Sequence, residues 1–313
     1  MNYLLFLQNI RESAPSFFNY FFVFISEGLV SGLIILPAIV FWCCDKKMGS
    51  WMLLNYSGSY FFNQIIKNTA CVYRPWIRDS RLYLAPQAVK SATGYSYPSG
   101  HTTIAASVLE STAVWQRKRK WVIVLCTILI LLVAFARNWL GAHTPADVLG
   151  AICCCSLILS INIFLVREEE KHDNFDWLFV LVGLVLSVGC MFYFELKSYP
   201  IDMDANGNVL VEPYKMITDC YTGEGLFAGF LIGWLIEKRL INFRLDVSKK
   251  RKIVRGIAGA VSTGLIYIVV MPLILKITGA GAHIGHLIKY LVVMLWITCI
   301  YPLIIKLAER NVT

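Results

Sequence analysis

Charged residues are scarce in this chain. Asp, Glu, Lys and Arg together make up 16% of its 313 residues, whereas 57% are hydrophobic. Soluble domains usually contain about 25% charged residues. The composition therefore excludes an ordinary soluble protein and predicts an integral membrane protein. Membrane spans of about 20 residues would use almost the whole length, so we expect no separate soluble domain.

The chain also lacks the cysteine patterns of a metal centre or a disulfide framework. It has ten cysteines, without metal-ligand spacing, and we expect most of them to pack as small apolar side chains. The N-terminus lacks a basic segment, a short apolar core and a small-residue cleavage site, so no cleaved signal peptide is expected and the first span should remain as an anchor. Six of the cysteines lie inside apolar runs: Cys126, Cys153, Cys154, Cys155, Cys190 and Cys299.

Long apolar runs dominate the chain and predict an all-α fold, a polytopic membrane helical bundle of about nine transmembrane helices. The second and third runs are the most polar, and their Ser, Thr and Asn side chains should face the interior of the bundle. The nine runs are Phe17–Cys43, Trp51–Ala70, His101–Trp115, Trp121–Trp139, Pro145–Val166, Trp177–Leu196, Cys220–Ile236, Gly256–Leu275 and Ile284–Ile305.

The net charge of +9 follows the predicted membrane topology and does not indicate binding to nucleic acid. With nine spans, 18 of the 29 Lys and Arg residues lie on one side of the membrane and 11 on the other. Three of those 11 belong to the polar clusters described below. The positive-inside rule then places the side with more Lys and Arg in the cytoplasm. The polar clusters and the N-terminus are predicted on the extracytoplasmic side.

Three clusters of polar residues lie at the ends of the predicted spans. The third of them along the chain, Arg137–Asp147, lies at the junction of two apolar runs. Thr144 is a suitable N-cap, Pro145 suits the first helical position, and Asp147 falls in the first turn, so a helix should begin here. The carboxylate could orient the imidazole of His143 while Arg137 holds an anion against it. Taken alone, these residues could also be ordinary polar groups at the ends of two spans.

Two further clusters are predicted on the same side. If the second span continues as a helix to Tyr73, Lys67 and Arg74 lie on one face, and two unpaired cations there would need an anion. The other cluster is Tyr97–His101, directly before a helix. Its Ser and Gly residues and the free N–H groups of a helix start suit a phosphate-sized anion, and His101 could give a proton to a leaving oxygen.

The three patterns together are Lys-x6-Arg-Pro, Pro-Ser-Gly-His and Arg-x5-His-x3-Asp. This set resembles the three-part signature of the type 2 phosphatidic acid phosphatase family, which includes vanadium haloperoxidases and glucose-6-phosphatase. The resemblance covers roughly Trp51–Val166. We expect a phosphatase core with the first six spans at 1–196 and a three-span extension at 197–313 that packs on the same bundle. The third motif of the family usually begins Ser-Arg, whereas this chain has Ala136-Arg137, so one hydroxyl contact to phosphate is missing.

The resemblance implies a role for each matching residue. Lys67, Arg74 and Arg137 would bind the phosphate oxygens, and Ser99 and Gly100 would add hydrogen bonds. The resemblance to the phosphatases of this family implies that this chain needs neither a metal ion nor another cofactor, and three cations can neutralise the phosphoryl charge as Mg²⁺ does elsewhere.

The catalytic groups follow from the same resemblance. His143 would attack phosphorus to form a phosphohistidine, Asp147 would hold its imidazole in the reactive tautomer, and His101 would protonate the leaving alkoxide. The implied enzyme is a metal-independent phosphoric monoester hydrolase that acts on a lipid phosphate or diphosphate at the outer membrane face. Phosphatidate-like lipids, isoprenoid diphosphates and sphingoid-base phosphates all remain candidate substrates.

Two alternatives stay open at this point. One is the hydrolysis of a soluble sugar phosphate, since the layout is similar to that of glucose-6-phosphatase. The other is a non-catalytic transporter or flippase for lipid phosphates, although anion binding alone does not need two histidines. Glu224, His283 and His286 in the last three spans are interpreted as structural or interfacial polar groups. The sequence does not specify the oligomeric state.

Overall fold

The computed structural model describes residues 1–279 and 281–309, and Arg310, one of the basic residues counted above, lies outside them. The described residues are mostly helical, with the longest connections between Ala70 and Gly100 and between Leu196 and Pro213, and β pairing is limited to a single bridge between Met203 and Val209. The fold is therefore the expected all-α, multi-pass membrane bundle. The ten cysteines are all free.

The chain folds into two compact units built from interleaved segments. The helices α3 (Val30–Cys43), α4 (Lys46–Ala70) and α8 (Pro145–Lys171) each contribute residues to both units. The predicted division of the chain after Leu196 stays a prediction. Unit 1 comprises Met1–Ile34, Phe62–Leu159 and Lys197–Met216, and unit 2 comprises Ile35–Phe61, Ser160–Leu196 and Ile217–Thr313.

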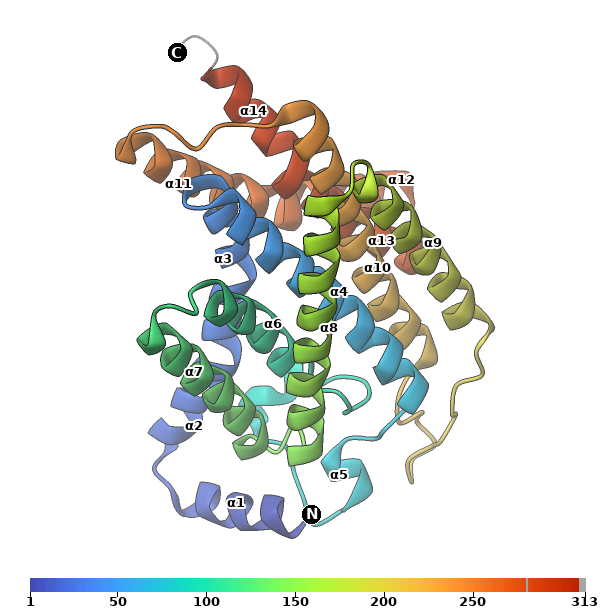
Figure 1. Cartoon of the computed structure of the whole chain (residues 1–313). Helices are drawn as coiled ribbons and strands as arrows, with labels where there is room; N and C mark the ends of the chain where they lie inside the picture. The colour runs from blue at the N-terminus through green and yellow to red at the C-terminus, as the bar shows by residue number, and fades with distance from the viewer. Residues whose placement is uncertain (280, 310–313) are drawn as a thin grey trace. The chain divides into compact units, whose positions relative to one another are not determined.

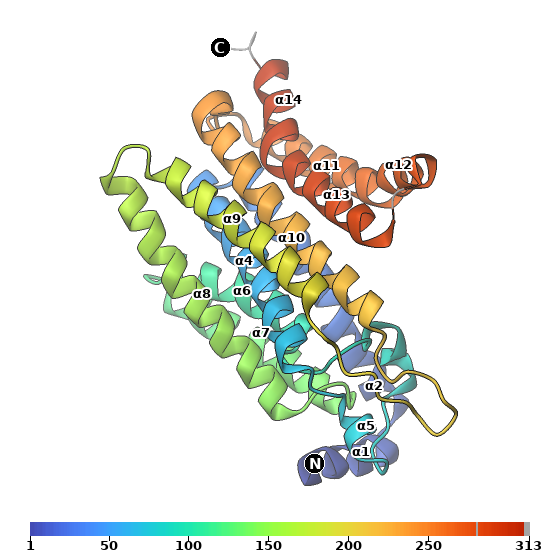
Figure 2. The same ribbon diagram turned by 90° about the vertical axis from the view of Figure 1, so that its right-hand side faces the viewer.

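Unit 1 contains the three polar clusters. Its helices α6 and α7 are joined by a short turn and pack side by side, as Figures 1 and 2 show. Four consecutive basic residues, Arg117–Lys120, occupy that turn and the first residue of α7. Besides its parts of α3, α4 and α8 and the start of α10 (Pro213–Ile236), the unit contains α1 (Asn2–Ser13), α2 (Ser16–Val23), α5 (Pro75–Arg78), α6 (Gly100–Trp115) and α7 (Lys120–Trp139).

Helix α1 is hydrogen-bonded to the end of α7 and to the loop that precedes the second cluster. The guanidinium of Arg11 donates to the carbonyl oxygens of Trp139 at 3.0 Å and Tyr83 at 2.9 Å. The amide of Gln8 donates to the carbonyl oxygen of Arg81 and accepts from the N–H of Tyr83. Because Arg11 and Gln8 are buried, α1 is an integral part of unit 1 and supports the corner that follows α7.

Unit 2 contains the C-terminal helices, in which glycines allow α10 to pack closely against α13. A Cβ atom on Gly225 would lie 2.5 Å from the carbonyl oxygen of Leu287, and one on Gly229 would lie 2.7 Å from that of Leu291. Such small-residue stripes are typical of helix pairs in membranes. The C-terminal helices are α9 (Phe175–Leu196), α10 (Pro213–Ile236), α11 (Lys249–Leu265), α12 (Met271–Thr278), α13 (Ala282–Leu295) and α14 (Tyr301–Ala308).

Helices occur at all nine predicted spans, and six of them are long and apolar enough to cross a membrane. The other three are α4, α6 and α10, and α6 is only 16 residues long. The total of nine spans remains a prediction. The six are Ser16–Cys43, Lys120–Trp139, Pro145–Lys171, Phe175–Leu196, Lys249–Ile277 and Ala282–Ala308.

The ionisable residues of the last three predicted spans have partners within unit 2. Glu224 is fully buried and accepts a hydrogen bond from Ser187. His283 lies 3.3 Å from a carboxylate oxygen of Glu195, and His286 contacts the hydroxyl of Thr222 at 3.0 Å.

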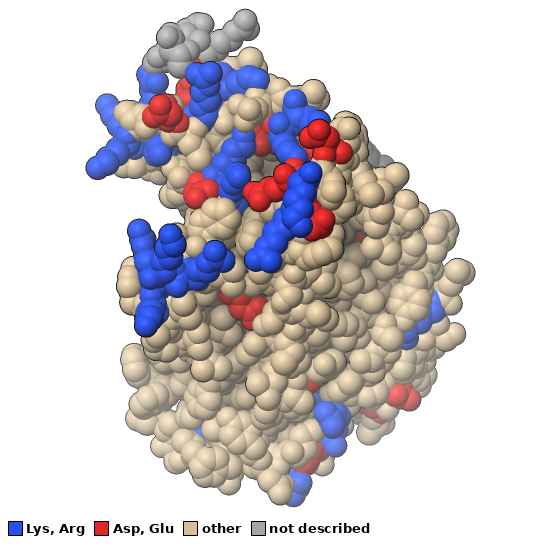
Figure 3. All heavy atoms as spheres, in the orientation of Figure 1, with Lys and Arg blue, Asp and Glu red and all other residues tan. Residues whose placement is uncertain are grey.

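Figure 3 shows Lys and Arg side chains gathered at the turn between α6 and α7 and around α11.

Candidate active site

The corner between α7 and α8 positions the third cluster. Helix α8 begins at Pro145, as predicted, and its start is fixed by two reciprocal bonds. The N–H of Thr144 donates to the carboxylate of Asp147 at 2.6 Å, and the N–H of Asp147 donates to the hydroxyl of Thr144 at 3.3 Å. The turn that leads there contains Gly141 with φ +74°, a left-handed conformation that favours glycine.

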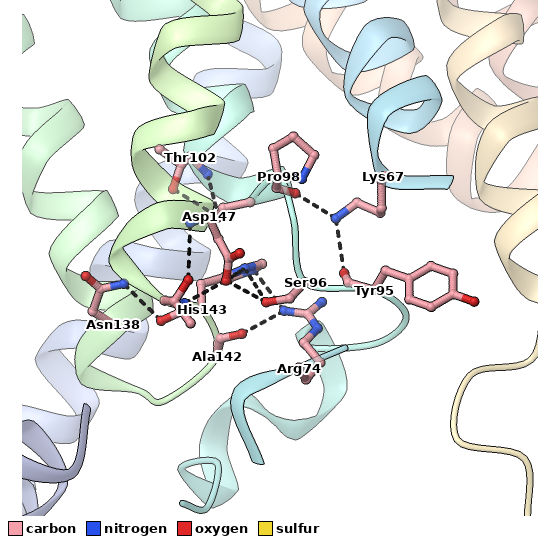
Figure 4. Close-up of polar contacts among 12 residues, drawn as sticks. Lys67, Arg74, Tyr95, Ser96, Pro98, Thr102, Asn138, Ala142, His143 and Asp147 are labelled. Atoms are coloured by element: carbon pink, nitrogen blue, oxygen red, sulfur yellow. Dashed lines mark hydrogen bonds and ion pairs between the residues drawn. The ribbon is translucent and has the colours of Figure 1, made fainter. Parts of the chain in front are cut away.

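His143 is buried at this corner, and its two ring nitrogens have different neighbours (Figure 4). Its Nε2 lies 2.9 Å from NH1 of Arg74. Its Nδ1 lies 3.6 Å from the carboxylate of Asp147 and 3.5 Å from the hydroxyl oxygen of Ser96. Because a guanidinium only donates, Nε2 must be an acceptor, so the proton of the neutral ring is on Nδ1. The unprotonated Nε2, whose lone pair here accepts the hydrogen bond from Arg74, is what a nucleophile requires.

The electrostatic surroundings keep that imidazole neutral. Burial lowers the pKa of His143 well below its usual value, and the nearby cations Arg74, Arg137 and Lys67 lower it further. A neutral ring at neutral pH retains the lone pair needed to attack phosphorus.

Asp147 is held through Ser96 as well as through the helix cap. The hydroxyl of Ser96 donates to Oδ2 of Asp147 at 2.6 Å and lies beside Nδ1 of His143. The direct distance of 3.6 Å between the carboxylate and the imidazole is longer than a hydrogen bond. The sequence predicted a direct contact between Asp147 and His143. In the structure the hydroxyl of Ser96 lies beside both groups.

Arg74 forms hydrogen bonds to two loops next to His143, one before α6 and one between α7 and α8. Its guanidinium donates to the carbonyl oxygens of Gly94, Thr93 and Ala142 at distances of 2.7 to 3.0 Å. Burial, together with the charge of Arg137, lowers the pKa of Arg74 to about 9, so Arg74 is still a cation at neutral pH. An anion placed beside Nε2 of His143 would offset that unfavourable charge.

Lys67 and Arg74 do not lie on one helical face, so that prediction was wrong. Helix α4 ends at Ala70, and Cys71 has a positive φ of 47°, which turns the chain before Arg74. The two cations nevertheless hold the same loop. Lys67 donates to the carbonyl oxygens of Pro98 at 2.7 Å and Tyr95 at 3.2 Å.

Helix α6 begins directly after the second cluster, as predicted, and Ser99, which was expected to offer its hydroxyl and amide to an anion, has partners within the protein. The hydroxyl of Ser99 accepts from the N–H of Thr102, and its own N–H donates to the carbonyl oxygen of Asp147 at 3.0 Å. This bond joins the second cluster to the third. Gly100 has open space where a side chain would begin, which leaves room for an anion at the helix start.

Arg137 is completely buried and only partly bonded. Its NH1 donates to the hydroxyls of Ser26 at 2.7 Å and Ser91 at 3.3 Å and to Glu27 at 3.1 Å. Within the described residues, its Nε and NH2 have no hydrogen-bond partner. A buried guanidinium edge without acceptors is costly, and a phosphate group could accept both hydrogen bonds.

His101 lies at the start of α6 with its side chain 21% exposed, and its Nε2 is 3.1 Å from a carboxylate oxygen of Glu27. Neither Glu27 nor Ser96 was predicted from the sequence to be a site residue. A carboxylate inside an apolar run is a signal that could have identified Glu27. A single serine in a polar loop gives no comparable signal for Ser96.

All eight predicted site residues belong to unit 1, which brings three cations close to two imidazoles and two carboxylates. Among the described residues, His, Cys, Asp and Glu side chains form no group of three suited to hold a metal ion. The assembled groups are those needed to bind a phosphoryl group, attack it and protonate a leaving oxygen.

Two family models match the chain. Residues 49–169 match the PAP2 superfamily, and residues 221–310 match the transmembrane extension of PAP2 superfamily phosphatases. The chain belongs to the PAP2 superfamily. It is thus a multi-pass membrane phosphatase, and the extension accounts for the last three predicted spans.

Similar PAP2 proteins are found in bacteria and archaea. The chain is 29% identical to phosphatidylglycerophosphatase B of Bacillus subtilis over 48% of this chain and 72% of that protein. It is 32% identical to the undecaprenyl-diphosphatase BcrC of the same organism, over 44% and 68%. An undecaprenyl-diphosphatase of Sulfolobus acidocaldarius is 27% identical over 41% and 61%. No solved structure gives a significant match.

Proposed function

We propose that this PAP2 phosphatase removes phosphate from a membrane lipid phosphate or diphosphate through a phosphohistidine on His143. The observation that supports it most is the placement of Nε2 of His143 beside Arg74, with the Nδ1 side of the ring against Ser96 and Asp147. The similar proteins are named for phosphatidylglycerophosphate and undecaprenyl diphosphate, which are both lipids with a terminal phosphate.

The reaction has two steps. In the first, Nε2 of His143 forms a bond to phosphorus while the bond to the lipid oxygen breaks, and His101 gives its proton to that oxygen. In the second, His101 takes a proton from a water molecule, whose oxygen attacks phosphorus and releases His143. Lys67, Arg74 and Arg137 stabilise the charge on the phosphoryl oxygens in both steps, with Ser99 and Gly100 at the helix start.

Substrate chain length tests the lipid part of this proposal. We expect kcat/KM of the purified protein to fall steeply as the acyl or prenyl chain is shortened, because each buried CH₂ contributes about 0.8 kcal/mol. Rates on a panel of lipid phosphates, isoprenoid diphosphates and glucose 6-phosphate would measure this. Equal kcat/KM for a long-chain lipid and the sugar phosphate would favour the sugar-phosphatase alternative, and binding without hydrolysis of any of them would favour a transporter.

We further propose that the site faces the extracytoplasmic side, on the basis of the unequal distribution of Lys and Arg. A cysteine placed at Asn206, in the exposed loop before α10, should react with a membrane-impermeant maleimide added to intact cells. One placed at Asp246, in the exposed segment before α11, should react only after the cells are opened. Serine replacements of Cys44 and Cys71 would remove background labelling near span ends. The opposite labelling pattern would put the active site in the cytoplasm.

A further inference from the structure

Glu27 brings a carboxylate from the first membrane span into the active site. It lies in a π-helical segment, Phe24–Leu29, and precedes the residues that match the PAP2 model. Such segments are frequent at functional sites. One carboxylate oxygen lies 3.1 Å from Nε2 of His101, and the other accepts from NH1 of Arg137, also at 3.1 Å. The side chain is 37% exposed, so it reaches the site from its open side.

The bonds of Arg137 indicate that Glu27 and a phosphate can bind this side chain together. Glu27 bonds to NH1, whereas Nε and NH2 are buried and have no partner in the described part of the chain. Nε and NH2 form one edge of the planar guanidinium, which suits two parallel bonds to phosphate oxygens. Glu27 therefore fixes the orientation of Arg137 and leaves the phosphate-binding edge open.

The Nε2 atoms of the two imidazoles face groups of opposite charge. Nε2 of His143 faces the cation Arg74, which favours a neutral ring. Nε2 of His101 faces the carboxylate of Glu27, which favours a protonated ring. The two neighbours thus separate the roles of chemically identical side chains, one as nucleophile and one as acid.

We propose that Glu27 is a positioning residue that keeps His101 protonated on both nitrogens, so that Nδ1 can give its proton to the leaving oxygen. This inference rests on the proposed phosphohistidine mechanism. As the bond between phosphorus and the lipid oxygen breaks, its electron pair stays on that oxygen, which takes the proton of Nδ1. His101 is then neutral and its bond to Glu27 is kept, until Nδ1 recovers a proton from the attacking water.

The test compares two substrates with the same alkyl tail but different leaving groups. An alkyl phosphate releases an alkoxide that needs a proton, whereas a nitroaryl phosphate releases a phenolate that does not. For Glu27→Gln we expect kcat/KM, which reports the formation of the phosphoenzyme, to fall about 10- to 100-fold on the alkyl phosphate, less than the 10²–10⁴-fold expected for His101→Ala. On the nitroaryl phosphate, kcat/KM should stay within about threefold of wild type, because its leaving group needs no proton.

The double variant Glu27→Gln/His101→Ala shows whether the carboxylate acts through the histidine. It should be no slower on the alkyl phosphate than His101→Ala alone, because a positioning residue has no effect once its target is gone. Glu212→Gln, which removes an exposed carboxylate of unit 1, is the matched control and should behave like wild type.

Three results would overturn the inference. Equal losses on both substrates would make Glu27 a structural residue, a lower KM with faster turnover would make it a competitor of phosphate, and unchanged kinetics would leave it without a role in the reaction. Rapid quenching with ³²P-labelled nitroaryl phosphate separates this question from the mechanism itself. Glu27→Gln should still form a phosphoenzyme, and failure of the wild type to form one would reject the phosphohistidine instead.

Discussion

Replacing His143 with alanine is expected to abolish turnover of the lipid substrate, with a loss of roughly 10⁵-fold or more, the scale seen when a hydrolase loses its nucleophile. The reason is that Nε2 of His143, which lies 2.9 Å from NH1 of Arg74, carries the lone pair that attacks phosphorus. Steady-state hydrolysis by the purified variant in detergent or lipid vesicles measures this loss.

Loss of the nucleophile should leave anion binding in place. Phosphate should still raise the Tm of His143→Ala, because Lys67, Arg74 and Arg137 remain and a ligand of the folded state stabilises it. Acid-labile, base-stable ³²P-phosphoenzyme should form in the wild type and be absent from the variant.

Two further variants guard against a folding defect. His143→Gln replaces the buried ring with a side chain of similar size and should be equally inactive with a Tm near that of wild type. His172→Ala, an exposed histidine of unit 2, should remain fully active. Hydrolysis by His143→Ala at the wild-type rate would exclude the phosphohistidine and leave His143 with a structural role at the start of α8.

The sequence predicted the local features of the site well where the signal is carried by neighbouring residues. The start of α8 at Thr144-Pro145 and the start of α6 directly after the second cluster depend on neighbouring residues, and both occur. The arrangement of Lys67 and Arg74 was mispredicted because it depends on where α4 ends. The left-handed conformation of Cys71 ends that helix, and cysteine carries no recognisable signal for it.

Contacts between distant parts of the chain could not be predicted from spacing. Glu27 is separated from His101 by 74 residues and from Arg137 by 110. Its charge within an apolar run is a signal for a function but does not indicate a partner. The bond from the amide of Ser99 to the carbonyl oxygen of Asp147 has no sequence signal at all, because every residue except proline has such groups.

Replacing Asp147 with asparagine should slow turnover by roughly 10²–10⁴-fold while KM changes little, as expected when an imidazole loses the carboxylate that holds its tautomer. Attack by Nε2 leaves a positive charge on the imidazole of His143, and the carboxylate 3.6 Å from Nδ1 stabilises that charge. Asparagine can still accept from the N–H of Thr144, so α8 should begin at the same residue and the Tm should fall only slightly. Values of kcat, KM and Tm for the purified variant measure these effects.

Ser96→Ala separates the charge of Asp147 from the geometry that surrounds it. The hydroxyl of Ser96 bonds to Asp147 at 2.6 Å, and its loss removes one hydrogen bond but no charge. Such a bond contributes about 1 kcal/mol, so kcat should fall only about fivefold. If Ser96→Ala were as slow as Asp147→Asn, the hydroxyl would be the group that orients Nδ1 of His143. If Asp147→Asn kept the wild-type rate, the carboxylate would serve only as the cap of α8. The proposed order, with the charge of Asp147 dominant and the hydroxyl of Ser96 secondary, requires the larger loss from Asp147→Asn.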